Sequence, residues 1–253
     1  MFERMTVPDR VEAAKEKTER VVDHLLYLLE LHENNAIIVY SPTLSSQIPT
    51  SHAANAFNVF QRGLHQFEIV RLCALWDRAE PTRENIPTIV ELIDHPDVID
   101  VLVEETRSHW ASIETHISNP PDDPELAVAA IEGLRQSNER FGNEQAAKAR
   151  CGLTTAIRDA RAILSSLRLV GIMNLRDKHL AHSLSQTRRE QKSGPVAPME
   201  YGDEREVLFS SLPIVEAFFC WVNGKSFSFA DSREIDQRNA RALWHGCKFA
   251  VLR

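Results

Sequence analysis

The chain has 253 residues, of which 43% are hydrophobic and 26% are charged. This length gives one or two domains, and this composition excludes a disordered or a fibrous protein. The 9 glycines, 12 prolines and 7% aromatic residues are too few for the turns and strands of a β-sandwich or barrel. The formal net charge of −7 argues against a protein that binds nucleic acid over its whole surface.

The charge is unevenly distributed along the chain. Residues 1–120 hold 10 basic and 19 acidic side chains, whereas residues 135–192 hold 12 basic and 5 acidic ones. The acidic total therefore comes from one half of the chain, and a basic cleft built from the second stretch is compatible with it.

The cysteines and the apolar windows indicate the compartment. Four scattered cysteines without a C-x-x-C pair argue against a disulfide framework or a cysteine zinc site, and they favour a reducing cytoplasm. The N-terminus is charged and lacks the apolar run of a signal peptide. The most apolar window, 212–222, is too short to span a bilayer and contains Glu216. We expect a cytoplasmic protein with no membrane partner.

Apolar residues recur with the period of an α-helix along almost the whole chain, so the sequence predicts an all-α fold. In chain order, helices are expected over 8–33, 53–79, 86–93, 97–117, 125–173, 204–222 and 231–251. No internal repeat divides the chain, and we expect a single helical domain over residues 1–253.

Prolines and polar runs separate the expected helices. The stretch 40–51 has the prolines, serines and threonines of a loop, and Pro81 ends the second helix. The run 119–124 is the clearest break in the chain, and 186–203 has the composition of a mobile surface loop. Three glycines are candidate interruptions of the long helical stretch: Gly133, Gly142 and Gly152.

Several catalytic motifs are absent from the sequence. There is no glycine-rich phosphate loop, no G-x-S-x-G nucleophile elbow and no H-E-x-x-H zinc motif. His179 and His182 occupy neighbouring helix positions, but no acidic or cysteine ligand follows at a matching spacing. We therefore expect neither a metal site nor a cofactor.

One constellation carries a chemical hypothesis. Arg176 and His182 are separated by five residues, and the polar Asp177 follows the arginine directly. A second pair, Arg238 and His245, has a similar spacing. Spacing alone does not choose between the two pairs.

The context of the first pair resembles a known superfamily. The run 175–182, with an apolar helix before it, resembles the signature of HEPN proteins, in particular their abortive-infection U (AbiU-type) branch. The stretches 72–77 and 238–244 are similar to that branch as well, so the resemblance extends from about Ala53 to the C-terminus.

The resemblance implies a HEPN-like bundle, with a four-helix core and extra N- and C-terminal helices. It implies a metal-independent ribonuclease that acts as a homodimer, in a toxin–antitoxin pair or in phage defence. A nucleotidyltransferase-type antitoxin is the partner that the resemblance suggests. Some HEPN toxins carry a tyrosine, the target of that antitoxin, where this chain has Leu184, which puts this mode of neutralisation in doubt.

The residues of the first pair suit metal-free RNA cleavage. Attack of a 2′-OH on the adjacent phosphorus needs an acid and base, for which His182 is the candidate because imidazole titrates near neutrality. It also needs a cation for the developing phosphoryl charge, for which Arg176 is the candidate. Asp177 is either an orienting group or a helix cap or salt-bridge partner, and Lys178 and His179 are candidate RNA contacts.

Two questions stay open in the sequence: how Arg176 and His182 come together, and whether the protein is catalytic. On an ideal helix, Arg176 and His182 lie about 120° apart, so they do not share a face. Asn174 and Asp177 resemble a capping box, which predicts a helix start whose N–H groups favour phosphate. A non-catalytic module that binds an antitoxin or another protein, or a scaffold without an RNA role, would carry the same helices, although the resemblance favours an enzyme.

Overall fold

The computed structural model describes residues 2–113 and 122–251, and within these ranges the chain is helical and forms no strand. The all-α prediction is confirmed. The elements are η1 (Phe2–Arg4), α1 (Val7–Ile38), α2 (Pro42–Ser45), α3 (His52–Leu75), α4 (Ile86–Ile93), α5 (Pro96–Ala111), α6 (Pro124–Leu164), α7 (Leu167–Leu175), η2 (Arg176–Leu180), α8 (Arg188–Ser193), α9 (Asp203–Asn223) and α10 (Phe229–Trp244).

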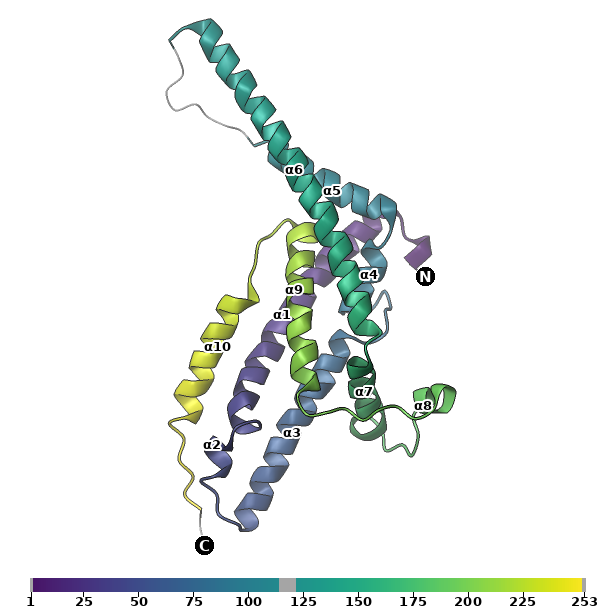
Figure 1. The fold of residues 1–253 in the computed structure, drawn as a ribbon, viewed down its shortest axis with the longest axis vertical. Helices are drawn as coiled ribbons and strands as arrows, with labels where there is room; N and C mark the ends of the chain where they lie inside the picture. Colours follow the sequence, from purple (N-terminus) through teal and green to yellow (C-terminus); the bar gives the residue numbers. More distant parts are fainter. Residues whose placement is uncertain (1, 114–121, 252–253) are drawn as a thin grey trace.

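The bundle is organised around α1, which packs against α3, α4, α9 and α10 (Figure 1). Its apolar face, including Val21, Leu25 and Leu29, is buried in one cluster with Phe218 of α9. The apolar positions of the helical sequence pattern are thus the buried ones, because each helix packs one side against the shared core.

The end of α3 differs from the expected bound of residue 79. The helix ends at Leu75, and the indole of Trp76 is buried and donates to Ser211 Oγ at 3.0 Å. Asn85 then donates to the Asp77 carbonyl at 3.0 Å, which satisfies a backbone group outside the helix. These tertiary hydrogen bonds end α3 about one helical turn before the expected bound. They also orient Asp77 towards the end of α7.

The glycines of α6 do not interrupt it, and that expectation is wrong. The helix runs unbroken from Pro124 to Leu164, and two of the three glycines are points of close helix contact. A Cβ on Gly142 would lie 2.8 Å from the Arg107 carbonyl oxygen, and one on Gly152 would collide with Trp221. The part of α6 before Gly142 extends beyond the bundle (Figure 1), and none of its residues is buried.

α9 is the one described helix whose length and hydropathy would let it cross a membrane. Its side chains Val207, Ile214 and Phe218 are buried, and the helix packs against α1, α6 and α7. In this fold α9 is therefore a core helix of the bundle.

Other segments also differ from the sequence predictions. The single helix expected over 125–173 is divided at Ser165 and Ser166 into α6 and α7. The loops expected over 40–51 and 186–203 contain the short helices α2 and α8, and the last helix ends at Trp244 rather than at residue 251. Thr187 and Glu190 form a capping box that starts α8. The helix expected over 97–117 already ends at Ala111. Residues 114–121, with half of the expected break at 119–124, lie outside the described ranges.

Candidate functional site

The candidate motif lies where α7 widens into a π-helical turn. Ser166 caps the start of α7, and the turn η2 follows without a break. The Ala181 N–H donates to the Arg176 carbonyl at 2.8 Å, which is the five-residue step of a π-helix. Such turns occur frequently at functional sites.

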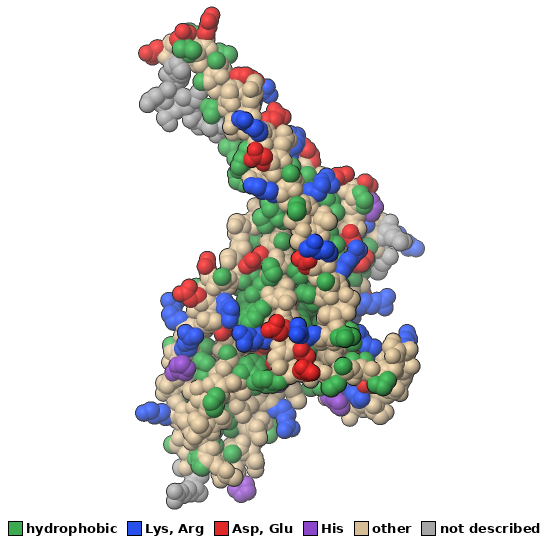
Figure 2. Space-filling view, in the orientation of Figure 1, with side chains coloured by type: hydrophobic (Ala, Val, Ile, Leu, Met, Phe, Trp, Pro, Cys, Tyr) green, Lys and Arg blue, Asp and Glu red, His purple; other side chains and the backbone are tan. Residues whose placement is uncertain are grey.

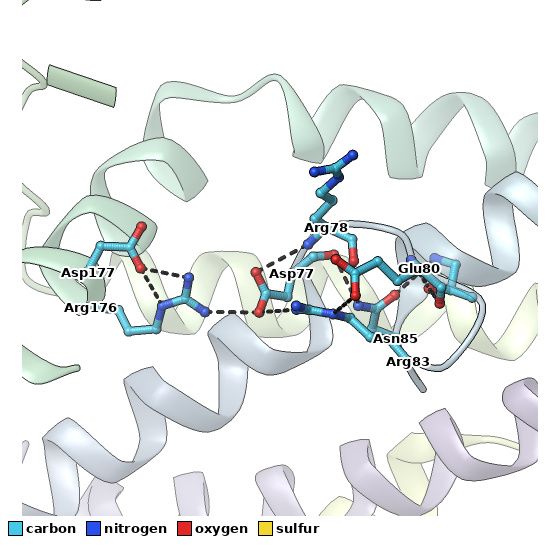
Figure 3. Close-up of polar contacts among 8 residues, drawn as sticks. Asp77, Arg78, Glu80, Arg83, Asn85, Arg176 and Asp177 are labelled. Atoms are coloured by element: carbon cyan, nitrogen blue, oxygen red, sulfur yellow. Dashed lines mark hydrogen bonds and ion pairs between the residues drawn. The ribbon is translucent and has the colours of Figure 1, made fainter. Parts of the chain in front are cut away.

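The Arg176 guanidinium is held by two carboxylates from different elements. Its Nε and Nη2 lie 2.9 and 2.7 Å from Asp177 Oδ1, and its Nη1 lies 3.3 Å from Asp77 Oδ2. Asp77 Oδ2 also accepts from Arg83 at 2.5 Å, and Arg83 pairs with Glu80 at 3.1 Å. Figure 3 shows this row of alternating charges between η2 and the chain after α3.

The Arg176 guanidinium keeps Asp77 ionised at neutral pH. Burial alone would raise the pKa of Asp77, but the Arg176 guanidinium and its hydrogen bond hold this pKa below its ordinary value. Burial raises the pKa of the neighbouring Cys73 thiol to about 12, so that thiol stays neutral. Asp77 thus shares its charge between Arg176 and Arg83, and a phosphate at Arg176 has to compete with Asp77 and Asp177.

A second polar cluster braces the segment that follows. Glu190 Oε1 accepts from Asn174 at 3.1 Å and from Lys178 at 3.0 Å, and its Oε2 accepts from the Thr187 N–H at 2.8 Å. The Thr187 N–H, with Lys178 and Asn174, lowers the pKa of Glu190 to about 2. These bonds tie α8 to α7 on both sides of the stretch that carries His182.

The predicted helix start at Asn174 is wrong. Asn174 is buried inside α7, and its Oδ1 accepts from the Thr187 hydroxyl at 2.6 Å. Ser166 already caps the helix, so the backbone N–H groups near Arg176 are occupied within α7 and η2 and are not presented to a phosphate.

The structure does not join Arg176 to His182 within one chain. His182 is exposed just after η2, and among the described residues it makes no hydrogen bond or ion pair. His179 is exposed on η2, whereas Lys178 is held by Glu190. The motif thus offers one fixed cation and one unconstrained imidazole.

The second candidate pair lies on another side of the bundle. Arg238 and His245 are exposed on α10 and at its end, and α10 and α7 flank opposite sides of the core (Figure 1). Ala240 is buried, whereas Leu243 is 60% exposed. Trp244 anchors this helix instead, by donating to Asn34 Oδ1 at 2.7 Å.

The basic stretch 135–192 is largely paired in the fold. Seven of its cations lie within ion-pair distance of carboxylates, several of which belong to the acidic half of the chain. On the face in Figure 2, basic and acidic side chains are interspersed. The local excess of positive charge does not translate into a uniform basic surface there.

Sequence reasoning missed the basic helix beside the motif. Arg188, Arg189 and Lys192 are exposed on α8, which Glu190 ties to Asn174 and Lys178. The pattern Thr187-x-x-Glu190 is a capping box and could have predicted this helix within the expected loop.

The site is an open surface rather than one of the larger cavities. Five cavities of about 480 to 780 Å³ are distributed over the bundle, and none of these five is lined by Arg176 or His182. Among the residues that the structure describes, no group of three or more histidine, cysteine or acidic side chains could hold a metal ion.

A family model matches most of the chain. The model of the family HEPN_AbiU2, described as AbiU2, matches residues 12–243, which is most of the chain. The matched range contains Asp77, Arg176, His182 and α8. No curated protein and no solved structure matches the chain.

Proposed function

The chain belongs to the AbiU2 family of HEPN proteins, and on this premise we propose that it is a metal-independent endoribonuclease. It acts in the cytoplasm as a toxin or phage-defence effector, and its substrate is RNA. The observation that carries the proposal is a fixed guanidinium and an unconstrained imidazole at the surface end of one helix, beside the basic helix α8.

Arg176 is the group that stabilises the phosphate charge. Asp177 and Asp77 fix the plane of its guanidinium, so little side-chain entropy is lost when a phosphate binds there. Asp177 acts as a positioning residue, because it touches Arg176 and no reacting atom. Lys178 and His179, with Arg188 and Arg189 of α8, supply contacts to the RNA backbone.

His182 transfers the protons. It removes the proton of the 2′-OH as a base, and a protonated histidine gives a proton to the leaving 5′-oxygen. One chain offers a single His182, so two copies related by twofold symmetry would supply both the base and the acid. The products are a 2′,3′-cyclic phosphate and a 5′-hydroxyl.

An exposed apolar face of α3 supports the homodimer. Val59, Phe60, Phe67 and Val70 recur at helical spacing on this face and are 38% to 70% exposed. Exposed apolar patches of this kind mark interaction surfaces. The face runs towards Asp77, so a second copy that covers its Val70 end lies close to Arg176.

The alternative is a non-catalytic module that binds a partner antitoxin or another protein. The compensation of Arg176 by two carboxylates favours it, because a neutralised arginine attracts phosphate less. In that case the α3 face and α8 serve for protein recognition.

The experiment is RNA cleavage by the purified protein in the presence of EDTA. Wild type is compared with Arg176→Ala and His182→Ala, and the matched controls are Arg238→Ala and His245→Ala. We expect at least a hundredfold loss in the first two variants, wild-type rates in the controls, and products that end in a cyclic phosphate.

The outcomes separate the two functions. Cleavage that persists in both Arg176→Ala and His182→Ala rejects this site, and cleavage lost only in the controls moves it to α10. A wild-type protein that binds a partner but cleaves none of a panel of structured RNAs favours the binding module.

A further inference from the structure

A long cavity lies between α6 and α9, which pack side by side (Figure 1). Its volume of about 780 Å³ is the largest of the five cavities described above and falls in the range of small-ligand sites. α6 lines the cavity from Lys148 to Ile163, and α9 lines it from Ser210 to Trp221. The cavity therefore follows about four turns of α6.

The floor of this cavity is apolar. Ala156 and Ile214 are each 3% exposed, and Ile163 is partly buried against the core. Gly152 lets the Trp221 ring lie directly on α6, because a Cβ at this position would stand 2.2 Å from the indole Nε1. The floor thus offers an apolar ligand a surface that begins at an aromatic ring and ends at an aliphatic side chain.

Most of the polar side chains that line the cavity have no partner among the described residues. Lys148 is exposed and makes no ion pair, and neither Trp221 Nε1 nor the Thr155 hydroxyl makes a hydrogen bond. Asp159 is the one carboxylate in the lining of this cavity, and Arg158 holds it at 2.8 Å. The cavity therefore presents one free positive charge and no free negative charge.

The free cation lies at one end of the cavity. Lys148 precedes Gly152 by one helical turn on the same face of α6, and Trp221 packs on Gly152. The Lys148 ammonium and the Trp221 indole N–H therefore belong to the same end, and the apolar floor continues from there towards Ile163. This arrangement matches a ligand with one anionic head group and an apolar chain.

We propose that this cavity binds an aliphatic carboxylate of the fatty-acid type. The carboxylate accepts from Lys148 and from the Trp221 N–H, and the chain is buried along the floor over Ala156 and Ile214. A single free cation balances the single charge of a carboxylate, whereas RNA requires a series of cations along its backbone. The inference goes beyond the proposed function and does not depend on RNA cleavage, because no residue of the motif lines this cavity.

The test is calorimetric titration of the full-length protein at neutral pH, where aliphatic acids are ionised. The probes are decanoate, octanoate and 1-decanol. We expect decanoate to bind at least tenfold more tightly than 1-decanol, because only the carboxylate pairs with Lys148. Decanoate should also bind about tenfold more tightly than octanoate, because two further methylene groups are buried.

Two pairs of variants locate the ligand. Lys148→Gln should lose the preference for decanoate over 1-decanol, and Lys248→Gln, at another exposed lysine without an ion pair, should keep it. Thr155→Phe fills the middle of the cavity and should weaken decanoate binding at least tenfold. Thr154→Phe is its control, since Thr154 is exposed on the same helix and does not line the cavity.

Each result decides one way. Equal affinity for decanoate and 1-decanol, or no binding of decanoate up to millimolar concentration, overturns the proposal. Unchanged binding in Thr155→Phe overturns it too, and so does binding of an amphipathic leucine–glutamate peptide in place of decanoate, which assigns the cavity to a protein partner. If Thr155→Phe unfolds, Lys148→Gln decides alone, because it changes an exposed side chain without a partner.

Discussion

At the scale of single residues, Asp77 makes two ion pairs that no local stretch of the sequence predicts. It joins Arg176, on η2, to Arg83, in the chain that follows α3. The two arginines lie 93 residues apart in the sequence, yet one carboxylate oxygen contacts both. The arginine of the motif is therefore oriented by a residue outside it.

We predict that Asp77→Asn destabilises the protein by about 1–3 kcal/mol, because it leaves two cations without a shared partner. Glu80→Gln is the control, since the Glu80 carboxylate pairs with Arg83, which is more exposed than Arg176. It should cost about 0.5 kcal/mol or less. Urea unfolding measures both, and equal losses in the two variants would contradict the bridging role.

Glu190 makes the free energy of unfolding depend on pH. Its folded pKa of about 2 lies below the ordinary value, so its stabilising contribution is present above about pH 4 and is lost as the pH falls through 2. We predict that Glu190→Gln is less stable than wild type at pH 7 and that the gap narrows at pH 3. Urea unfolding at both pH values tests this, with the exposed Glu234→Gln as control. A gap independent of pH refutes it.

At the scale of elements, the sequence predicted where the helices form but not which contacts join them. The bounds of α4 were predictable because Asn85 caps it and the Ile86 to Ile93 run is apolar. The role of Asn174 was not, because its partner Glu190 lies on another element and an asparagine is equally suited to a helix cap. In the candidate site, the motif was visible in the sequence, whereas Asp77, Glu190 and α8 acquire their roles only through folding.

The glycines of α6 are a second case in which the sequence did not reveal a contact between helices. Gly142→Ala should destabilise the protein by about 1–3 kcal/mol, because the added Cβ meets a backbone oxygen of α5 that has little freedom to move. Gly63→Ala, on the exposed face of α3 with no neighbour within 4 Å, should stabilise it by about 0.5–1 kcal/mol. Thermal unfolding compares them, and the opposite order would refute the close contact.

At the scale of the whole molecule, the exposed apolar face of α3 is the proposed contact between two copies. The homodimer and the single domain over residues 1–253 stay predictions. We predict that Val70→Asp converts a dimer into a monomer without unfolding it, since it places a charge in the apolar contact. Leu243→Asp, on α10, is the control at an exposed apolar position. Sedimentation velocity measures both, and a wild-type monomer or an intact Val70→Asp dimer refutes this interface.

The part of α6 before Asn138 extends from the bundle, so small rotations there become large displacements (Figure 1). From Pro124 to Ser137 no residue of the helix is buried. Asn138 then donates to the Ile113 carbonyl at 2.8 Å, and Gly142 packs against the Arg107 carbonyl of α5. Fourteen helical residues span about 21 Å, so a tilt of about 10° at that pivot moves the tip by about 4 Å. A small change in the orientation of α5 would therefore move the tip of α6 much further than it moves the residues of the bundle.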